Sequence, residues 1–389
     1  MALFSKEEIE STLKTLEDWK KQNRNIVVLV DIGGTNTRIS FSYLESTGDF
    51  LKMTYQKVKS TRIVLQLFQQ ISKAIEDKII IHSGIIAIAG RVSENRKNGT
   101  MTNFILPKEN QEISIEELPR NLFPDENSVF INDLEGCCYG LLFLDQNKQL
   151  QNYFQPLWKG REIILEEKSQ FGIKKANSVI LGMGTGLGVG LIVYSTLESK
   201  FYVVPTEFGH AIINPKDPTF SDEESGLISY ISNKKYQGKY SVEYEDICSG
   251  SGLVFCYNFL VEKMGLKLDP IEAAQISQKS MIDHPNDPYY DVCRKAQEIH
   301  YRFLFRLAQN ICVALQCKSI FLALDNQVKN NKFVISLADK FSQEFFFHPK
   351  NEWLNDVHCL RQISSDENLN ITFMGCLFLS QNFFTQKNL

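Results

Sequence analysis

The chain has 389 residues, of which 43% are hydrophobic and 23% are charged, and these fractions are typical of a globular protein with a full core. The length predicts two or three domains. A formal net charge of −4 gives no basic surface field, so we expect no nucleic-acid partner. No apolar run approaches the roughly 18 residues of a membrane span, so we expect no membrane association.

Nine cysteines occur without any C-x-x-C pair, so the sequence predicts neither a disulfide framework nor a zinc ribbon. An odd number of cysteines, several of them in apolar surroundings, is typical of a reducing compartment. Without a signal-peptide core, the chain is expected to be cytoplasmic. The C-terminal K-N-L resembles the peroxisomal signal S-K-L only loosely, which makes a peroxisome-like microbody the weaker alternative.

The first predicted elements are a helix and a pair of strands. Residues 4–22 have the spacing of an amphipathic helix. Residues 26–30 form an apolar run, and residues 37–41 alternate as a returning strand would. Between them, D-I-G-G-T-N contains two glycines that leave backbone N–H groups uncovered. Taken alone, this stretch is most simply a plain β-hairpin capped by Asp31.

Strand-like and helical patterns then alternate to the end of the chain, which predicts an α/β fold. The clearest helical patterns cover residues 64–77, 135–144 and 302–317, and the clearest buried strands cover 84–90, 128–132 and 319–324. A second strand–glycine turn–strand unit lies near residue 182, similar to the one near residue 30. We therefore expect two similar lobes with a cleft between them.

The second glycine turn, G-M-G-T-G-L-G-V-G, matches neither common nucleotide motif. No register of G-x-G-x-x-G fits, a strand follows instead of a helix, and G-K-[ST] is absent. A glycine-rich hairpin and an anion-binding turn with Thr185 at its apex are both open. Two such Gly-Thr turns could hold a polyphosphate together, with Asp31 holding a hydrated Mg²⁺.

Polar side chains follow the buried strand at 128–132. Asn132 and Asp133 lie at its carboxyl end, where open α/β sheets place ligands. Asp133 could simply cap the next helix. It could also accept a proton from a hydroxyl group during phosphoryl transfer.

The motif P-T-E-F-G-H-A brings Glu207 and His210 to one loop, and Glu245 precedes a further small-residue turn. H-E-x-x-H is absent and no cysteine lies nearby, so a metal site is not expected. A lone histidine is more often structural, and a single glutamate is more often only a solvated charge. Sugar hydroxyls, however, are typically held by Asn, Asp, Glu and His together.

In this order, D-I-G-G-T-N-T-R, I-N-D, the G-T-G-L-G turn, E-x-G-H and E…S-G-x-G-L resemble the bacterial-type glucokinases, which also occur in unicellular eukaryotes. These belong to the actin-like sugar-kinase superfamily. The resemblance implies two ribonuclease-H-like α/β lobes with an interdomain active-site cleft. It implies a helical extension at 1–24, a small domain at 25–135 plus 372–389, and a large domain at 136–371.

The resemblance also implies site residues, with Asp133 as the general base for the 6-hydroxyl of D-glucose. The implied hydroxyl-binding residues are Asn132, Glu207, His210 and Glu245. The implied phosphate-binding residues are Asp31, Gly33, Gly34, Thr35, Asn36, Gly184, Thr185 and Gly186. ATP and Mg²⁺ are the implied cofactors, with Asp31 reaching the metal through water. Relatives of this kind are often dimers, so a homodimer is open.

The chain departs from the family pattern at two places. Phe208 replaces the first glycine of the usual Glu-Gly-Gly-His, and the segment aligned with the adenosine loop, L-A-L-D-N-Q-V-K-N, lacks its Gly-Gly. The zinc motif of the related ROK group is absent after His210, which favours the non-zinc group. The alternatives are a non-catalytic sugar sensor, an actin- or chaperone-type ATPase, and a hexose kinase with another sugar or donor.

Overall fold

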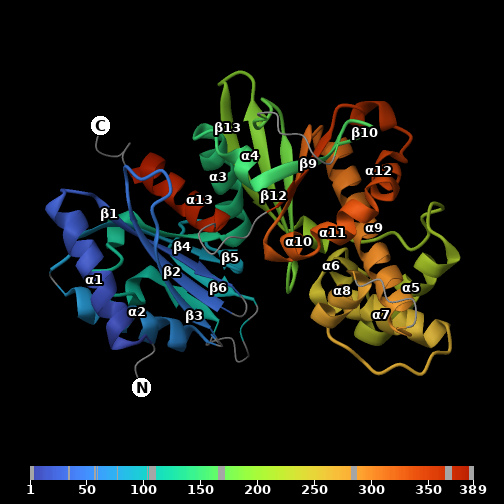
Figure 1. Cartoon of the computed structure of the whole chain (residues 1–389), viewed down its shortest axis with the longest axis horizontal. Helices are drawn as coiled ribbons and strands as arrows, with labels where there is room; N and C mark the ends of the chain where they lie inside the picture. Colours follow the sequence, from blue (N-terminus) through green and yellow to red (C-terminus); the bar gives the residue numbers. More distant parts are fainter. Residues whose placement is uncertain are drawn as a thin grey trace. The chain divides into compact units, whose positions relative to one another are not determined.

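The computed structural model describes residues 4–33, 36–56, 58, 60–76, 78–102, 104, 111–164, 171–281, 287–363 and 370–384. The chain forms two compact units, Met1–Leu150 with Asp366–Leu389 and Gln151–Ser365. Each unit is built on one large sheet with helices packed against it (Figure 1).

The sheet of the first unit has five strands in the order β3-β2-β1-β4-β8. β1 is antiparallel to β2 and parallel to β4, and β8 is parallel to β4. Every residue of β1 is buried, as expected for a strand with a neighbour on both sides and helices over the sheet. The bounds are β1 Ile26–Ile32, β2 Asn36–Tyr43, β3 Leu51–Gln56, β4 Ile81–Ile88 and β8 Ser128–Asn132. A small sheet contains β5 Gly90–Val92, β6 Asn98–Met101 and β7 Glu112–Ser114.

Helices α3 and α13 form the closest helix pair of this unit. A Cβ atom placed on Gly140 would lie 2.0 Å from the carbonyl oxygen of Ile371, and one on Gly375 would lie 1.8 Å from that of Gly136. The glycines therefore permit a backbone approach that no larger residue allows. The helical elements are α1 Lys6–Lys21, α2 Thr61–Ile75, α3 Asp133–Gln146, α13 Ile371–Leu379, η2 Ile115–Glu117, η3 Asp125–Asn127 and the π-turn η6 Ser380–Phe384.

The two units divide the chain differently from the domains expected from the sequence. The expected small domain ended at residue 135, whereas the first unit continues to Leu150, because α3 packs along α13. The expected extension at 1–24 contains α1, as predicted, and α1 packs on α2 and β1 within the first unit.

The second unit has a seven-stranded sheet in the order β10-β9-β15-β14-β11-β12-β13. β11 is antiparallel to β12 and parallel to β14, and β15 is parallel to β14. Its central strands therefore repeat the order and directions of the first sheet, as the two strand–glycine turn–strand units predicted. The bounds are β9 Phe154–Lys159, β10 Glu162–Ile163, β11 Ser178–Met183, β12 Leu187–Ser195, β13 Lys200–Thr206, β14 Ser319–Ala323 and β15 His358–Gln362.

The helix α9 (Tyr290–Leu315) is the centre of the second core. Its apolar face packs with Trp158, which contacts Phe305 and Phe345 ring to ring. The other helical elements are α4 Leu150–Tyr153, α5 Asp222–Tyr236, α6 Glu245–Cys248, α7 Gly250–Lys263, α8 Ala273–Met281, α10 Asp325–Lys329, α11 Asn331–Ser336, α12 Ala338–Phe346, η4 Phe208–His210 and η5 Asn351–Leu354.

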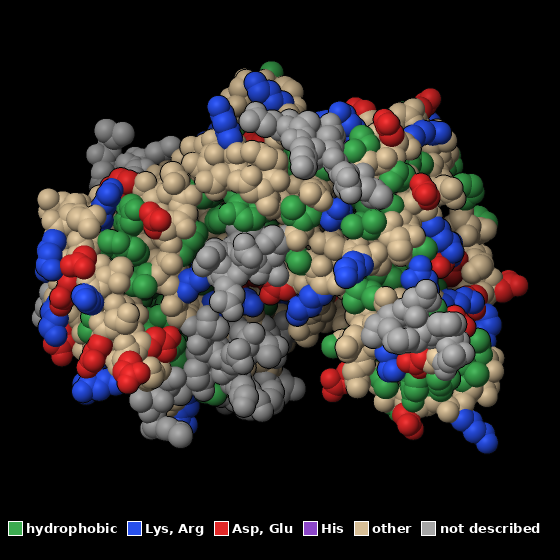
Figure 2. All heavy atoms as spheres, viewed as in Figure 1, with side chains coloured by type: hydrophobic (Ala, Val, Ile, Leu, Met, Phe, Trp, Pro, Cys, Tyr) green, Lys and Arg blue, Asp and Glu red, His purple; other side chains and the backbone are tan. Residues whose placement is uncertain are grey.

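Charged side chains of both signs are interspersed on the face drawn in Figure 2, without a large field of one sign. Among the described residues, no helix combines the length and apolar composition that crossing a bilayer requires.

Candidate active site

The first glycine turn joins β1 to β2. Ile32 pairs with Thr37, so the hairpin closes as the sequence predicted. Gly33 follows β1, whereas the predicted phosphate-binding residues Gly34 and Thr35 lie outside the described residues. Asn36 is described as the first residue of β2, without its side chain.

Asp31 is buried at the end of β1 and is held by two side chains. Arg38, opposite Asp31 in the register of β2, donates from Nη1 to Oδ2 over 3.0 Å. Asn370, the N-cap of α13, donates from Nδ2 to the same oxygen over 3.0 Å. The hydrogen bonds between Asp31 and described residues all end on Oδ2. Oδ1 therefore remains as the acceptor for any further donor.

Asn132 caps helix α3. Its Oδ1 accepts from the backbone N–H groups of Leu134 (2.9 Å) and Glu135 (3.3 Å), and the Glu135 carboxylate accepts from the Asn132 N–H in return. This is a complete capping box. Nδ2 donates to the carbonyl oxygen of Gly90 over 3.1 Å. The amide carries two hydrogens on Nδ2, so one donor is left for a ligand.

Asp133 is the first residue of α3 and is half-buried. The alternative in which Asp133 caps this helix is wrong, because Asn132 is the N-cap. The Oδ1 of Asp133 accepts from the Leu134 N–H over 2.9 Å. Glu135, two residues on, is paired with Arg96 by two hydrogen bonds of 3.0 and 2.7 Å.

The structure brings Asp31 and Asp133 to the same end of the first sheet. Both carboxylates act electrostatically on the buried thiol of Cys137 in α3. Burial, with smaller contributions from Asp133 and Asp31, raises the pKa of Cys137 to about 12. Asp31 and Asp133, which the sequence analysis assigned to phosphoryl transfer, therefore both lie near Cys137.

The second glycine turn lies between β11 and β12. The Gly184 N–H donates to the carbonyl oxygen of Gly186 over 2.8 Å, and the Gly250 N–H donates to that of Gly184 over 2.9 Å. Thr185 is exposed at the apex. A Cβ atom on Gly184 would meet no heavy atom closer than 4.0 Å, so its backbone is open to a ligand.

Glu245, at the start of α6, lies against this turn. Its Oε2 accepts from the Leu187 N–H over 2.8 Å. The same oxygen would be 2.7 Å from a Cβ atom on Gly186, so the glycine makes room for the carboxylate. Glu245 thus joins α6 to the end of the glycine turn.

His210 lies among three carboxylates. Its Nδ1 is 2.7 Å from Oε2 of Glu243, and its Nε2 is 3.8 Å from Oε2 of Glu207. Burial lowers the pKa of His210, but the hydrogen bond to Glu243 and the charges of Glu245, Glu243 and Glu207 outweigh it and raise the pKa above its usual value. The structure therefore brings Glu207, His210 and Glu245 near one another.

Glu243 was not predicted. It lies two residues before Glu245, and its strand-like bridge to Ile212 places it beside the loop that carries His210. The E-Y-E spacing, with two carboxylates on alternate residues, is the signal that could have identified it.

The glycine of E-F-G-H, Gly209, is required for steric reasons. A Cβ atom on Gly209 would lie 2.1 Å from the carbonyl oxygen of Leu187, so only glycine allows this approach to β12. Phe208, which replaces the usual first glycine, is 37% exposed.

The segment aligned with the adenosine loop keeps a glycine-like backbone without a glycine. Leu324, between β14 and α10, has φ +77°, a region that L-residues rarely adopt. Its N–H donates to Oε1 of Gln362 over 2.8 Å, which holds the strained peptide in place. Among the described residues, no group of three or more His, Cys, Asp or Glu could hold a metal ion.

Comparisons with known proteins show the family and the fold of the chain. A family model described as Glucokinase matches residues 28–340. Glucokinase 1 of Trichomonas vaginalis is 31% identical over 380 residues, which cover 95% of this chain and 96% of that protein. The crystal structure of Balamuthia mandrillaris glucokinase in complex with glucose is similar, with 32% sequence identity and a TM-score of 0.86. The match covers 97% of this chain and 100% of that one.

A ROK-family glucokinase from Streptomyces griseus, solved with glucose and AMPPNP, is 16% identical. The likeness covers 91% of this chain and 98% of that one with a TM-score of 0.57. It concerns the fold alone.

Proposed function

Because the chain belongs to the glucokinase family, we propose that it transfers the γ-phosphoryl group of ATP to the 6-hydroxyl of D-glucose. The main support is the position of Glu245. Its carboxylate accepts a hydrogen bond from the Leu187 N–H at the end of the glycine turn, and its charge contributes to the raised pKa of His210. The side chains that we propose to bind hydroxyl groups thus adjoin the glycine turn that we propose to bind phosphate, within the second unit. A sugar kinase needs that combination.

Asp133 is the proposed general base. Its carboxylate takes the proton of the 6-hydroxyl as the sugar oxygen attacks the γ-phosphorus, and the bond from that phosphorus to the bridging oxygen of ADP breaks. The nearby carboxylate of Glu135 already accepts two hydrogen bonds from Arg96, so Asp133 is the carboxylate that we propose for this proton.

The hydroxyl groups of glucose are proposed to bond to four side chains. Asn132 offers its remaining amide hydrogen, and Glu207 and Glu245 offer acceptor oxygens. With Nδ1 bonded to Glu243, His210 presents Nε2, which accepts a hydroxyl hydrogen when neutral and donates when protonated. A site of this kind rejects sugars that lack a bonded hydroxyl by up to about 10⁴-fold.

Phosphate binding is proposed to use backbone N–H groups of both glycine turns, those at 33–36 in the first turn and those of Thr185 and Gly186 in the second, because the Gly184 N–H is bonded to Gly186. The free Oδ1 of Asp31 suits a magnesium ion held through water, because Mg²⁺ in kinases keeps several waters and few protein ligands. When bound, the metal neutralises charge on the phosphates.

The test is ADP release from Mg·ATP with glucose, mannose, galactose, N-acetylglucosamine or no sugar. We expect turnover that depends on glucose. If the protein binds glucose in equilibrium dialysis but releases no ADP, it is a sensor or uses another donor, and ADP and polyphosphate are then supplied instead. ADP release that is indifferent to every sugar would mean an ATPase and would contradict the proposal.

A further inference from the structure

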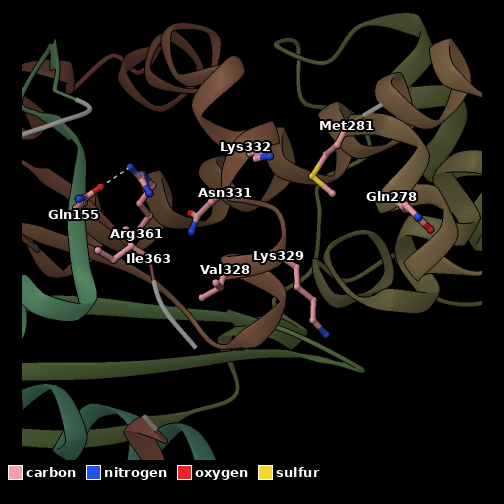
Figure 3. Close-up of a pocket in the computed structure, with 9 residues that line it drawn as sticks. All are labelled: Gln155, Gln278, Met281, Val328, Lys329, Asn331, Lys332, Arg361 and Ile363. Atoms are coloured by element: carbon pink, nitrogen blue, oxygen red, sulfur yellow. Dashed lines mark hydrogen bonds between the residues drawn. The ribbon is translucent and has the colours of Figure 1, made fainter. Parts of the chain in front are cut away.

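Buried polar side chains of helix α9 bond to two different regions of the second unit. Gln297 and Tyr301 donate to Asn330 and Gln327 of the segment aligned with the adenosine loop, over 2.9 and 3.3 Å. That segment also lines the pocket drawn in Figure 3, so the pocket belongs to the site already described. His300 lies on the same helix but bonds to α6, the helix that begins with Glu245.

Two hydrogen bonds join His300 to α6. Its Nδ1 lies 2.6 Å from the backbone oxygen of Ile247, and the Cys248 thiol donates to the backbone oxygen of His300 over 3.4 Å. Burial lowers the pKa of His300 to about 4, although the bond to Ile247 acts in the opposite direction, so the imidazole is neutral near pH 7. Because a carbonyl oxygen only accepts, the single ring hydrogen lies on Nδ1 and is donated to Ile247.

Helix α6 is too short to hold its own position. It has four residues, and no side chain caps its N-terminus. Nucleating a helix is unfavourable, and the last carbonyl groups of a helix find no partner within it. His300 supplies such a partner to the Ile247 carbonyl. A Cβ atom on Gly252 would lie 2.5 Å from the same oxygen, so close packing from α7 also fixes this peptide. Contacts with neighbouring helices therefore set the position of α6.

We propose that His300 is a positioning residue that acts through α6 to hold the Glu245 carboxylate at the second glycine turn. Glu245 lies two positions before Ile247, so a shift of the Ile247 peptide moves Glu245 with it. Oε2 of Glu245 accepts from the Leu187 N–H over 2.8 Å, and this is the contact that such a shift would lengthen. The inference rests on the proposed function, in which Glu245 binds a hydroxyl group of the sugar.

The test compares His300→Leu with His300→Asn in the full chain. Leucine removes the donor to Ile247, whereas the asparagine amide nitrogen is attached to Cγ, as Nδ1 is, and can replace it. We expect His300→Leu to bind glucose about tenfold more weakly in titration calorimetry, which corresponds to one lost hydrogen bond to a charged group. His300→Asn should bind glucose as wild type does. The KM for glucose should rise in His300→Leu with kcat nearly unchanged.

If His300→Leu does not fold, His300→Gln replaces it, because the glutamine amide nitrogen is attached one carbon further from the backbone and does not coincide with Nδ1. The same tenfold loss is expected. Unchanged glucose affinity in the variant that lacks the donor would overturn the proposal.

The matched control is Gln309→Leu on the same helix. Gln309 is buried, and its Nε2 donates to the backbone oxygens of Glu344, Phe345 and Phe347, at the end of α12. The control therefore loses a buried donor to backbone oxygens without touching α6. It should be less stable than wild type in urea unfolding but bind glucose equally well. An equal loss of glucose affinity in Gln309→Leu and His300→Leu would mean general destabilisation and would overturn the proposal.

Glu245→Gln separates this inference from the proposed function. If that variant binds glucose as wild type does, the hydroxyl-binding role of Glu245 is wrong. The position of α6 is then read from His210, whose pKa is raised in part by the charge of Glu245. We expect the His210 pKa, measured by NMR, to fall in His300→Leu and to stay unchanged in His300→Asn. A His210 pKa that is the same in both variants would overturn the positioning role, whatever the kinase assays show.

Discussion

The imidazole of His210 shows how much of this site is decided by single contacts. The conformation of its loop depends on the adjacent residues Phe208 and Gly209. Its charge depends on Glu243, which is thirty-three residues away in the sequence. The sequence predicted the histidine and two of its carboxylates from motif order. It did not predict Glu243, because the contact depends on the pairing of Ile212 with Glu243, a long-range bridge with no local pattern.

The raised His210 pKa gives a pH dependence of stability. The unfolded pKa is about 6.5. Since the folded pKa is higher, the stabilisation is complete below about pH 6.5 and is lost as the pH rises through the folded value. The side chain is 48% exposed, so we expect less than about 1 kcal/mol. Urea unfolding of wild type and His210→Gln should converge as the pH rises.

The control for this prediction is Glu243→Gln. It removes the hydrogen-bonded carboxylate, so the difference between wild-type and substituted His210 should become smaller in that background. A difference that grows with increasing pH would show that the folded state favours the neutral imidazole instead.

Gly209 and Gly184 should respond differently to the same substitution. Gly209→Ala places Cβ 2.1 Å from the Leu187 carbonyl oxygen, whereas Gly184→Ala meets nothing closer than 4.0 Å. We expect Gly209→Ala to lower the free energy of unfolding by about 1–3 kcal/mol and Gly184→Ala to change it little. Gly184→Ala should instead raise the KM for ATP, because the methyl group covers backbone that the phosphates approach.

Equal losses of stability in these two variants, measured by urea unfolding, would contradict the close backbone contact at Gly209 and the open surroundings of Gly184. The two substitutions add the same methyl group, so only the surroundings differ.

Single elements followed largely from local pattern. Alternation and apolar runs predicted both glycine hairpins, and the 3.6-residue spacing predicted a helix over residues 302–317, which corresponds to the second half of α9 (Tyr290–Leu315). The domain boundary differed because local pattern shows that residues 135–144 form a helix but does not show what the helix packs against. The pairing of α3 with α13 joins segments more than two hundred residues apart, and only the small residues Gly136, Gly140 and Gly375 indicate it.

The α3–α13 contact is tested by two substitutions on the same helix. Gly140→Ala would bring Cβ to 2.0 Å from a backbone oxygen of Ile371, whereas Gly136→Ala would meet a side-chain methyl group of Thr372 at 2.9 Å. Both gain the same helix propensity. We expect Gly140→Ala to be less stable than Gly136→Ala by about 1–3 kcal/mol in urea unfolding. If Gly136→Ala is the less stable variant, the helices pack in another register.

The whole molecule repeats one sheet pattern, because β3-β2-β1-β4-β8 and β13-β12-β11-β14-β15 have the same order and directions. The sequence indicated this repeat only through two glycine turns, since the halves share little else. Each unit contains residues that we propose for the reaction. The first has Asp31, Asn132 and Asp133, and the second has the open glycine turn and the carboxylates around His210.

The central claim is that Asp133 acts as the base of a glucose kinase, and Asp133→Asn tests it most directly. The amide preserves shape and cannot accept the proton. We predict that kcat for glucose-dependent ADP release falls by about 10²–10⁴-fold while the equilibrium affinity for glucose is nearly unchanged. A variant that keeps its kcat, or one that loses turnover only because it no longer binds glucose, would contradict this role.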